Sequence, residues 1–389
     1  MTAPEEIIAR AEALQPLIRE HAAKTEADRR VTTECMEAIG QAGLFEVSVP
    51  KRYGGDEATL RTMLDVSATI AEADGSTGWV VALTNVCNWL ASLFPQRAQE
   101  EVFGSGGARV TGVLTPTATT RKVEGGWEVT GRWYYNSGSW WSTWAVLGVP
   151  LTDETGEVVD QGLVLIPASD LTIEDVWHVA GMRGTASNCL VGENLFVPEY
   201  RVLSVPAAIE GQYPTEHAEE ALYRSAFVPV LTLVLAGPQL GMGRAALKLV
   251  IDKAARKPIS YTFFETQTES TAFQLQIADA ATKIDIATLL VRRAAADIDG
   301  AASQGEHLDY TARARVRADA GAAVHHIVDA LTTLMNAHGA GGFADVSPLQ
   351  RIWRDVNVAA RHAVISPAIG AEVYGKALLG VDDKITPLV

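Results

Sequence analysis

Hydrophobic positions recur at a spacing of three to four residues through the first hundred residues of the chain, which predicts amphipathic helices. The first run of such positions is Ile7, Ala11, Leu14 and Ile18. Further helices are expected at Thr33–Ala42 and Leu60–Ala73. Ser76 is a candidate N-cap for a fourth helix, whose apolar stripe consists of Trp79, Leu83, Val86 and Leu90. Pro95 is expected near the end of that helix because proline interrupts helical hydrogen bonding.

The pattern changes between about residues 106 and 215, where valine, threonine, tryptophan and tyrosine become frequent and turn signals recur. The stretch Arg121–Gly131 is typical of two strands joined by a hairpin turn at Gly125-Gly126. Further strands are predicted at Trp144–Val149, Gly162–Ile166 and Cys189–Val197. Strands grouped between helical regions indicate an α+β layout and not alternating βαβ units.

The last part of the chain returns to helical periodicity. Four long alanine-rich segments are expected at 226–256, 270–302, 308–338 and 348–379, with a break at Ser303–Gly305. Such segments with short connections predict a four-helix bundle. The chain is therefore expected to have an N-terminal α-helical domain (1–105), a central β-barrel or β-sandwich domain (106–215) and a C-terminal four-helix bundle (216–389).

Composition and charge narrow the possible partners. The 389 residues carry a formal net charge of −15, which argues against nucleic acid and anionic membrane as partners. The three cysteines lie far apart without metal-ligand spacing, so neither a disulfide framework nor a metal site is expected. No signal peptide is recognisable at the start. The apolar stretch Phe227–Leu235 is too short and too interrupted by proline to span a bilayer. We expect a cytoplasmic protein.

Three local patterns are candidates for chemistry. Asn136-Ser137-Gly138 follows a strand and reads equally well as an ordinary β-turn. The glycine loop His338–Phe343 offers backbone N–H groups to an anion or a ring edge, although helix ends commonly carry glycine. Near the C-terminus, no Asp or Glu occurs between Asp355 and Glu372, while a lone histidine, His362, stands in that interval. Taken singly, each pattern leaves the structural and the functional reading open.

Several short strings, in order along almost the whole chain, carry a family resemblance. They are Ser76–Trp79, Asn88-Trp89, Gln96–Gly104, Asp175–Thr185, Phe196–Pro198 and Trp353–Asp355. In this order and spacing the chain resembles the oxygenase components of two-component flavin-dependent monooxygenases, which have the acyl-CoA dehydrogenase fold. Within this family, these strings resemble most those of the actinobacterial secosteroid phenol hydroxylases and of the hydroxylases of aromatic polyketide pathways.

The resemblance implies a mechanism and a set of partners. A separate NAD(P)H:flavin reductase supplies reduced flavin, FMNH2 or FADH2, and O2 is the co-substrate. Oxygen adds to flavin C4a, and the resulting hydroperoxide transfers oxygen to a phenolic or fused-ring aromatic. Such a species survives only where water is excluded and its polar atoms are held by placed donors and acceptors. The family also implies a homotetramer.

The resemblance also assigns residues. The positions aligned with flavin contacts are Trp79, Gly112, Val113, Leu114, Tyr135, Asn136, Ser137, Ala340, Gly341, His362 and Ala363. Ser137 is expected to accept from flavin N5–H and to donate to the peroxide. His362 is expected to deprotonate the phenol or to donate to the peroxide. These two are the catalytic candidates.

Two comparisons with the family limit the substrate. Dehydrogenases of this fold keep a catalytic glutamate after the position of Asp355, and this chain has none there, so proton abstraction beside a thioester has no obvious base. Cys87 stands where secosteroid hydroxylases have a histidine, and Arg256–Ser260 replaces a more basic cluster. The substrate and the choice between FMN and FAD therefore stay open. The alternatives are an N-hydroxylase of an amine or amino sugar, an acyl-CoA dehydrogenase with a relocated base, and an inactive flavin-binding protein.

Overall fold

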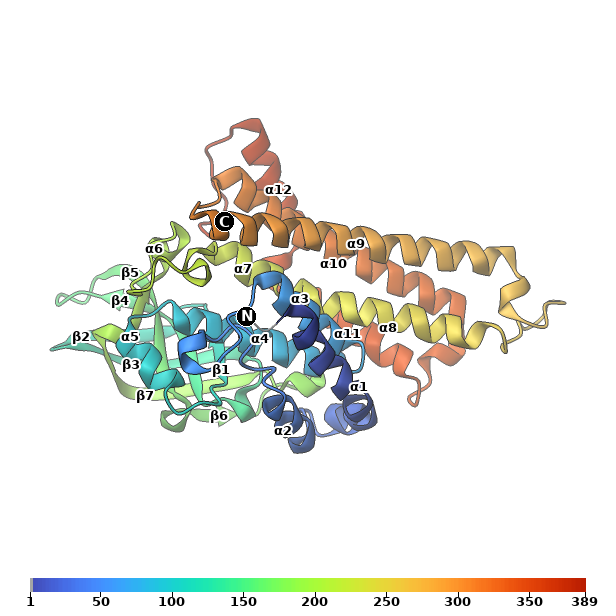
Figure 1. Ribbon diagram of the computed structural model, residues 1–389, viewed down its shortest axis with the longest axis horizontal. Helices are drawn as coiled ribbons and strands as arrows, with labels where there is room; N and C mark the ends of the chain where they lie inside the picture. The colour runs from blue at the N-terminus through green and yellow to red at the C-terminus, as the bar shows by residue number, and fades with distance from the viewer. Residues whose placement is uncertain (1–2) are drawn as a thin grey trace.

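The computed structural model describes residues 3–389, and its N-terminal region is helical, as the apolar periodicity predicted (Figure 1). The helices are α1 (Pro4–Ala27), α2 (Thr33–Gln41), α3 (Leu60–Ala71), α4 (Gly75–Ser92) and α5 (Gln96–Phe103). The expected N-cap of α4 was wrong. Asp74 caps this helix by accepting from the Thr77 N–H at 2.9 Å, and Ser76 lies inside the first turn. A carboxylate accepts this bond as readily as a hydroxyl does.

The central region is a sandwich of two four-stranded sheets. One sheet has the order β1-β4-β5-β8 and the other β2-β3-β7-β6. The strands are β1 (Val110–Val113), β2 (Ala118–Val123), β3 (Gly126–Asn136), β4 (Trp144–Thr152), β5 (Val158–Pro167), β6 (Thr172–Glu174), β7 (Asn188–Pro198) and β8 (Val202–Ser204). The inward residues of both sheets form one apolar cluster. This confirms the predicted strands, and it confirms the sandwich.

The hairpin lies one residue earlier than predicted. Val123 pairs with Gly126, so Glu124 and Gly125 form the two-residue turn and Gly126 already belongs to β3. Gly125 has φ 76°, a left-handed conformation that glycine adopts without strain.

The C-terminal region is built on three long helices that run side by side (Figure 1). Its helices are α7 (Phe227–Leu233), α8 (Ala236–Ala254), α9 (Thr271–Gln304), α10 (Tyr310–His338), α11 (Pro348–Ala359) and α12 (Pro367–Leu379). Two predicted helices are divided. Pro238 lacks the N–H that would continue the first one, and Pro367 excludes the helical conformation at Ser366. The break between α11 and α12 puts His362 in a turn and not on a helix.

The region around α7 and α8 forms part of the protein core. Phe227–Ala254 is long and apolar enough to cross a membrane by length and composition, but 78% of its most apolar window is buried inside the protein. Such burial is typical of a core helix.

The helices of the N-terminal region stop at Phe103, before the first strand at Val110, and the last strand ends at Ser204. The domain boundaries at 105 and 215 remain predictions.

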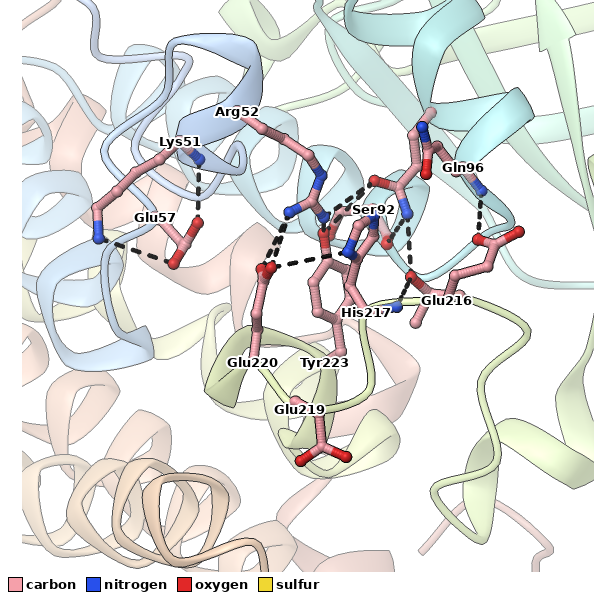
Figure 2. A network of polar contacts seen from close by, with 12 residues as sticks. Lys51, Arg52, Glu57, Ser92, Gln96, Glu216, His217, Glu219, Glu220 and Tyr223 are labelled. Atoms are coloured by element: carbon pink, nitrogen blue, oxygen red, sulfur yellow. Dashed lines mark hydrogen bonds and ion pairs between the residues drawn. The ribbon is translucent and has the colours of Figure 1, made fainter.

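A polar network fastens the segment after the β-domain onto the N-terminal region (Figure 2). The Arg52 guanidinium donates to both carboxylate oxygens of Glu220 at 3.0 Å, and it also donates to the Tyr223 hydroxyl. Tyr223 donates in turn to the side-chain oxygen of buried Gln99 at 3.4 Å. The His217 ring stacks on Tyr223 with centroids 5.9 Å apart. Hydrogen bonds between charged groups with matched geometry are the stronger ones. This network therefore holds in place the segment that leads from the β-domain to the C-terminal helices.

Candidate active site

Three regions of the chain bring predicted site residues together. Trp79 comes from α4, Ser137 follows the end of β3, and His362 follows α11. The Trp79 indole N–H donates to the Ser137 hydroxyl at 3.2 Å. The rings of Trp79 and His362 lie with centroids 6.1 Å apart. Residues separated by 58 and by more than 200 positions in sequence thus meet around one tryptophan.

Ser137 has hydroxyl neighbours that the sequence did not single out. The Ser187 hydroxyl lies 2.8 Å from that of Ser137, and the Thr185 hydroxyl lies 2.7 Å from that of Ser187. All three side chains are buried. Thr185 and Ser187 belong to a tight turn in which Met182 and Ala186 have positive φ. Two non-glycine residues in the left-handed region are uncommon, and a sequence carries no signal for them.

The residues beside Ser137 have the donors and acceptors that a flavin ring edge requires. Asn136 is fully buried, and neither polar atom of its side chain has a hydrogen-bond partner within residues 3–389. Over the same residues the buried Thr111 hydroxyl is also unpaired. A buried amide normally has partners, so this one fits a ring that both donates and accepts. Reduced flavin has such an edge, and the residues present fit it.

Gly112 of β1 packs closely against its neighbours on β4 and α4. A Cβ on Gly112 would lie 2.8 Å from the Val146 side chain and 2.9 Å from the Cys87 sulfur. Val113 ends β1, which pairs in parallel with β4, and Leu114 follows it. Burial raises the pKa of the Cys87 thiol to about 12, so this side chain is neutral. A neutral thiol thus stands where the secosteroid hydroxylases have a titratable imidazole.

His362 is neutral and offers a donor. Its Nδ1 accepts from the Val364 N–H at 3.4 Å, so the ring hydrogen is on Nε2. Desolvation lowers the pKa of the ring to about 4. The side chain nevertheless keeps exposed area, so a bound molecule can reach the ring. Ala363 follows as the first residue of the short helix Ala363–Ile365.

Asp355, the last carboxylate before the gap, does not face this cluster. It is buried, and its Oδ1 accepts from the Met182 N–H. Burial, together with the nearby Asp74 carboxyl, raises its pKa to about 7. Asp355 therefore fastens α11 to the turn that carries Thr185 and Ser187. It is not positioned as a base for a bound thioester.

The glycine loop lies elsewhere in the chain. Ala340 and Gly341 are exposed in a short 3-10 helix (Ala340–Phe343) that packs on α10 and α11. The Lys257 ammonium lies 3.2 Å from the ring of His338, the first residue of the glycine loop. α11 rises about 18 Å from this loop toward His362. Within one chain, the loop therefore lies too far away to contact the Trp79–Ser137 pair.

The tryptophans that lie near Ser137 in sequence do not share one environment. Trp133 is fully buried in the sandwich core, and its indole N–H donates to the Gly148 carbonyl at 2.8 Å. The exposed Tyr135 ring packs beside the partly buried Trp177, with ring centroids 5.3 Å apart. A tryptophan on the inward side of an alternating strand points to the core, which local sequence could not distinguish from a ligand contact.

Two open surface recesses lie away from this cluster. They measure about 660 and 540 Å³, and both include Arg244 and Arg292 on the bundle. None of the predicted site residues lines either recess. The candidate site is therefore defined by the contacts of Trp79, Ser137 and His362.

Comparison with known proteins shows the family of this chain. Residues 9–106 match the family model of the acyl-CoA dehydrogenase N-terminal domain, and residues 233–367 match that of the C-terminal domain. The flavin-dependent monooxygenase oxygenase subunit HsaA of Rhodococcus jostii is 33% identical over 96% of this chain and 98% of the relative. The oxygenase component of the FADH2-dependent resorcinol hydroxylase of a Rhizobium species is 28% identical over 97% of this chain and 95% of its own.

A solved structure extends the comparison to three dimensions. XiaF from a Streptomyces species, in complex with FADH2 and glycerol, superposes with a TM-score of 0.93 at 37% identity and covers 98% of this chain and 97% of its own. The fold is that of the acyl-CoA dehydrogenases. Within that fold, the chain belongs to the oxygenase subunits of flavin-dependent monooxygenases. An oxygenase subunit works with a separate reductase.

Proposed function

We propose that this protein uses reduced flavin and O2 to hydroxylate a phenolic, fused-ring aromatic compound. The observation that carries the proposal is the meeting of Ser137 and His362 around Trp79. The absence of a carboxylate between Asp355 and Glu372 in the sequence supports it, because a dehydrogenase would need a base there. The relatives named above as hydroxylase and monooxygenase components point the same way.

The flavin is held, in this proposal, by the aligned residues of the β-domain and α4. Asn136 serves the polar ring edge, Ser137 serves N5, and Gly112 contributes a backbone contact. Trp79, Val113, Leu114, Tyr135 and Ala363 complete the contacts. The bound flavin supplies the electrons that activate oxygen. FADH2 is the flavin we favour, because it is named with both XiaF and the resorcinol hydroxylase.

The substrate is oriented by groups of this chain. The neutral His362 ring offers Nε2–H to the phenolic oxygen or to the reacting oxygen. Tyr135 and Trp177 provide aromatic surface at the edge of the site. Cys87 is a small neutral group where the secosteroid hydroxylases carry histidine, which favours a flat substrate without a second polar group at that wall.

The assembly is proposed to be a homotetramer, supplied by an NAD(P)H:flavin reductase. The long helix α9 exposes Leu275 and Leu289, each with 66% of its side-chain area accessible. These leucines are single exposed apolar side chains, so the tetramer is proposed from the family resemblance and not from this helix. Ala340 and Gly341 stay among the residues proposed to contact flavin on the family resemblance. Sedimentation should give a particle of four 41.6 kDa chains.

Product analysis tests the proposed substrate class. The protein is mixed with anaerobically reduced FAD, O2 and either 2-naphthol or a primary aliphatic amine, and the products are identified by mass spectrometry. A hydroxylated naphthol without a hydroxylamine supports the proposal. Hydroxylamine formation without aromatic product would replace it with the N-hydroxylase alternative.

A further inference from the structure

The candidate site contains an unbroken chain of hydrogen bonds with a donor-only group at one end and a carbonyl at the other. It starts at the Trp79 indole N–H and passes through the hydroxyls of Ser137, Ser187 and Thr185. It ends where the Thr185 hydroxyl donates to the Met182 carbonyl at 2.8 Å. All three hydroxyl side chains are at least 93% buried.

The two ends fix the direction of every bond between them. A carbonyl only accepts, so the single hydroxyl hydrogen of Thr185 is committed to Met182. The Ser187 hydrogen must then be donated to Thr185, and the Ser137 hydrogen to Ser187. At the other end an indole N–H only donates, so Ser137 accepts from Trp79. The hydrogens are thereby assigned without being observed.

This direction determines what Ser137 has left for a ligand. Its one hydrogen is used, and one of its two lone pairs is used. The remaining lone pair can accept, so Ser137 faces a bound molecule as an acceptor only. Of the two roles expected for this serine, accepting from a flavin N5–H is available, and donating is not.

We propose that Thr185 and Ser187 are positioning residues that hold Ser137 as a hydrogen-bond acceptor and thereby make the site prefer reduced over oxidised flavin. Reduced flavin has a hydrogen on N5, whereas oxidised flavin has a lone pair there. The inference rests on the proposed function, because it takes the ligand at Ser137 to be a flavin. It adds residues that do not touch the flavin and a reason for redox selectivity.

The far end of the chain is firmly anchored. The Met182 carbonyl also accepts from the Trp177 indole N–H at 2.8 Å, and the Met182 N–H donates to Asp355. A Cβ on Gly181 would lie 2.4 Å from the Arg354 carbonyl oxygen, so the turn lies directly on the backbone of α11. The carbonyl that sets the direction of the chain is therefore held by the helix that leads to His362.

The test is an equilibrium measurement on Thr185→Val, which removes the hydroxyl and keeps the side-chain volume. Without Thr185 to accept, Ser187 can donate to Ser137, and Ser137 can then donate to the N5 lone pair of oxidised flavin. We expect the ratio of the dissociation constants for oxidised and reduced FAD, titrated anaerobically, to fall by about 2- to 12-fold, the range of one net hydrogen bond. Thr185→Ser keeps a hydroxyl at this position and should therefore have the same ratio as the parent protein.

Two further variants separate positioning from packing. Thr232→Val makes the same change at a buried threonine of α7 whose hydroxyl has no partner within residues 3–389, and it should leave the ratio unchanged. In the Ser137→Ala background, Thr185→Val should add nothing, because it acts only through Ser137. An additive effect would overturn the inference, as would an unchanged ratio in Thr185→Val.

Failure of the proposed function looks different. If the parent protein binds neither oxidation state of FAD or FMN, the flavin site itself is wrong. If the parent binds reduced flavin and the ratio does not respond to Thr185→Val while Thr185→Val remains folded, the positioning inference alone is overturned. Circular dichroism of each variant records the fold.

Discussion

At the scale of single residues, the site depends on two side chains whose protonation and hydrogen positions are fixed by their surroundings. Ser137 receives the Trp79 N–H and gives its hydrogen to Ser187. His362 accepts at Nδ1 and is kept neutral by desolvation. Each therefore presents one defined polar atom to a ligand, which is the kind of preorganisation that stabilises a reacting centre.

Ser137→Ala should uncouple oxygen consumption from hydroxylation. The variant lacks the acceptor for the flavin N5–H, a loss that corresponds to about 2- to 12-fold for one net hydrogen bond, so a larger share of the oxygen should leave as hydrogen peroxide. The measurement is the ratio of hydroxylated product to peroxide per O2 consumed. Ser67→Ala, at a buried serine of α3, is the matched control. A parental ratio in Ser137→Ala would assign this serine to the turn alone.

His362→Ala should slow single-turnover oxygen transfer by about 100- to 10,000-fold and leave flavin binding nearly intact. Because the pKa of His362 is lowered to about 4, the ring stays neutral above that pH, and the deficit should be constant from about pH 5.5 to 8. As pH falls through about 4, protonation of Nδ1 breaks the bond from Val364 and the parent should lose its advantage. A step near pH 6.5 that disappears in His362→Ala would contradict this environment.

At the scale of secondary-structure elements, α11 and the turn before β7 are held together by hydrogen bonds and close packing. Arg354 donates to the Ala180 carbonyl and pairs with Glu26 of α1, and Asp355 accepts from Met182. The packing leaves no room for a side chain at Gly181. The position of the hydrogen-bonded hydroxyls of Ser137, Ser187 and Thr185 thus depends on how α11 packs against this turn.

Gly181→Ala should destabilise the protein by about 1–3 kcal/mol, the usual cost of overpacking. The added carbon would meet backbone atoms of Arg354 and Asp355 at 2.4 to 2.8 Å, and backbone does not move aside easily. Gly300→Ala is the control, since a Cβ there meets nothing within 4 Å inside α9. It should be neutral or stabilising by about 0.5–1 kcal/mol. Equal melting temperatures for the two variants would refute the close packing.

Asp355 should make stability depend on pH. Its folded pKa of about 7 lies above the unfolded value of 3.8. The stability it contributes is complete below about pH 4 and is lost as pH rises through 7. Asp355→Asn stays neutral and keeps an oxygen for the Met182 N–H. Between about pH 5 and 8 the melting temperature of the parent should therefore fall relative to that of Asp355→Asn, and parallel curves would show that Asp355 does not titrate in this range.

At the scale of the whole molecule, periodicity predicted the three regions because burial of one face repeats along each element. It also placed the ends of α2, α9 and α10 within a few residues. It missed the breaks at Pro238 and Pro367, whose local signal was present but was averaged away in long alanine-rich segments. The N-cap at Asp74 was missed because Asp and Ser serve that position equally well.

The site was predictable only in part, because contacts between distant segments leave no local pattern. The resemblance indicated Trp79, Ser137 and His362, and the fold brings them together. Thr185 was the last residue of a string already noted and Ser187 lay two residues beyond it, but their hydrogen bonds depend on positive φ at Met182 and Ala186. Trp133 went to the core, and Ala340 with Gly341 lies at the far end of α11.

Single-turnover incorporation of labelled oxygen tests the central claim most directly. The protein is loaded with reduced FAD without any reductant in excess, then mixed with ¹⁸O₂ and 2-naphthol, and in a parallel sample oxidised FAD is mixed with an acyl-CoA thioester. The account predicts one ¹⁸O atom in the hydroxylated ring and no bleaching of the flavin by the thioester. Flavin bleached by the thioester, with no labelled aromatic product, would contradict it and return the chain to dehydrogenase chemistry.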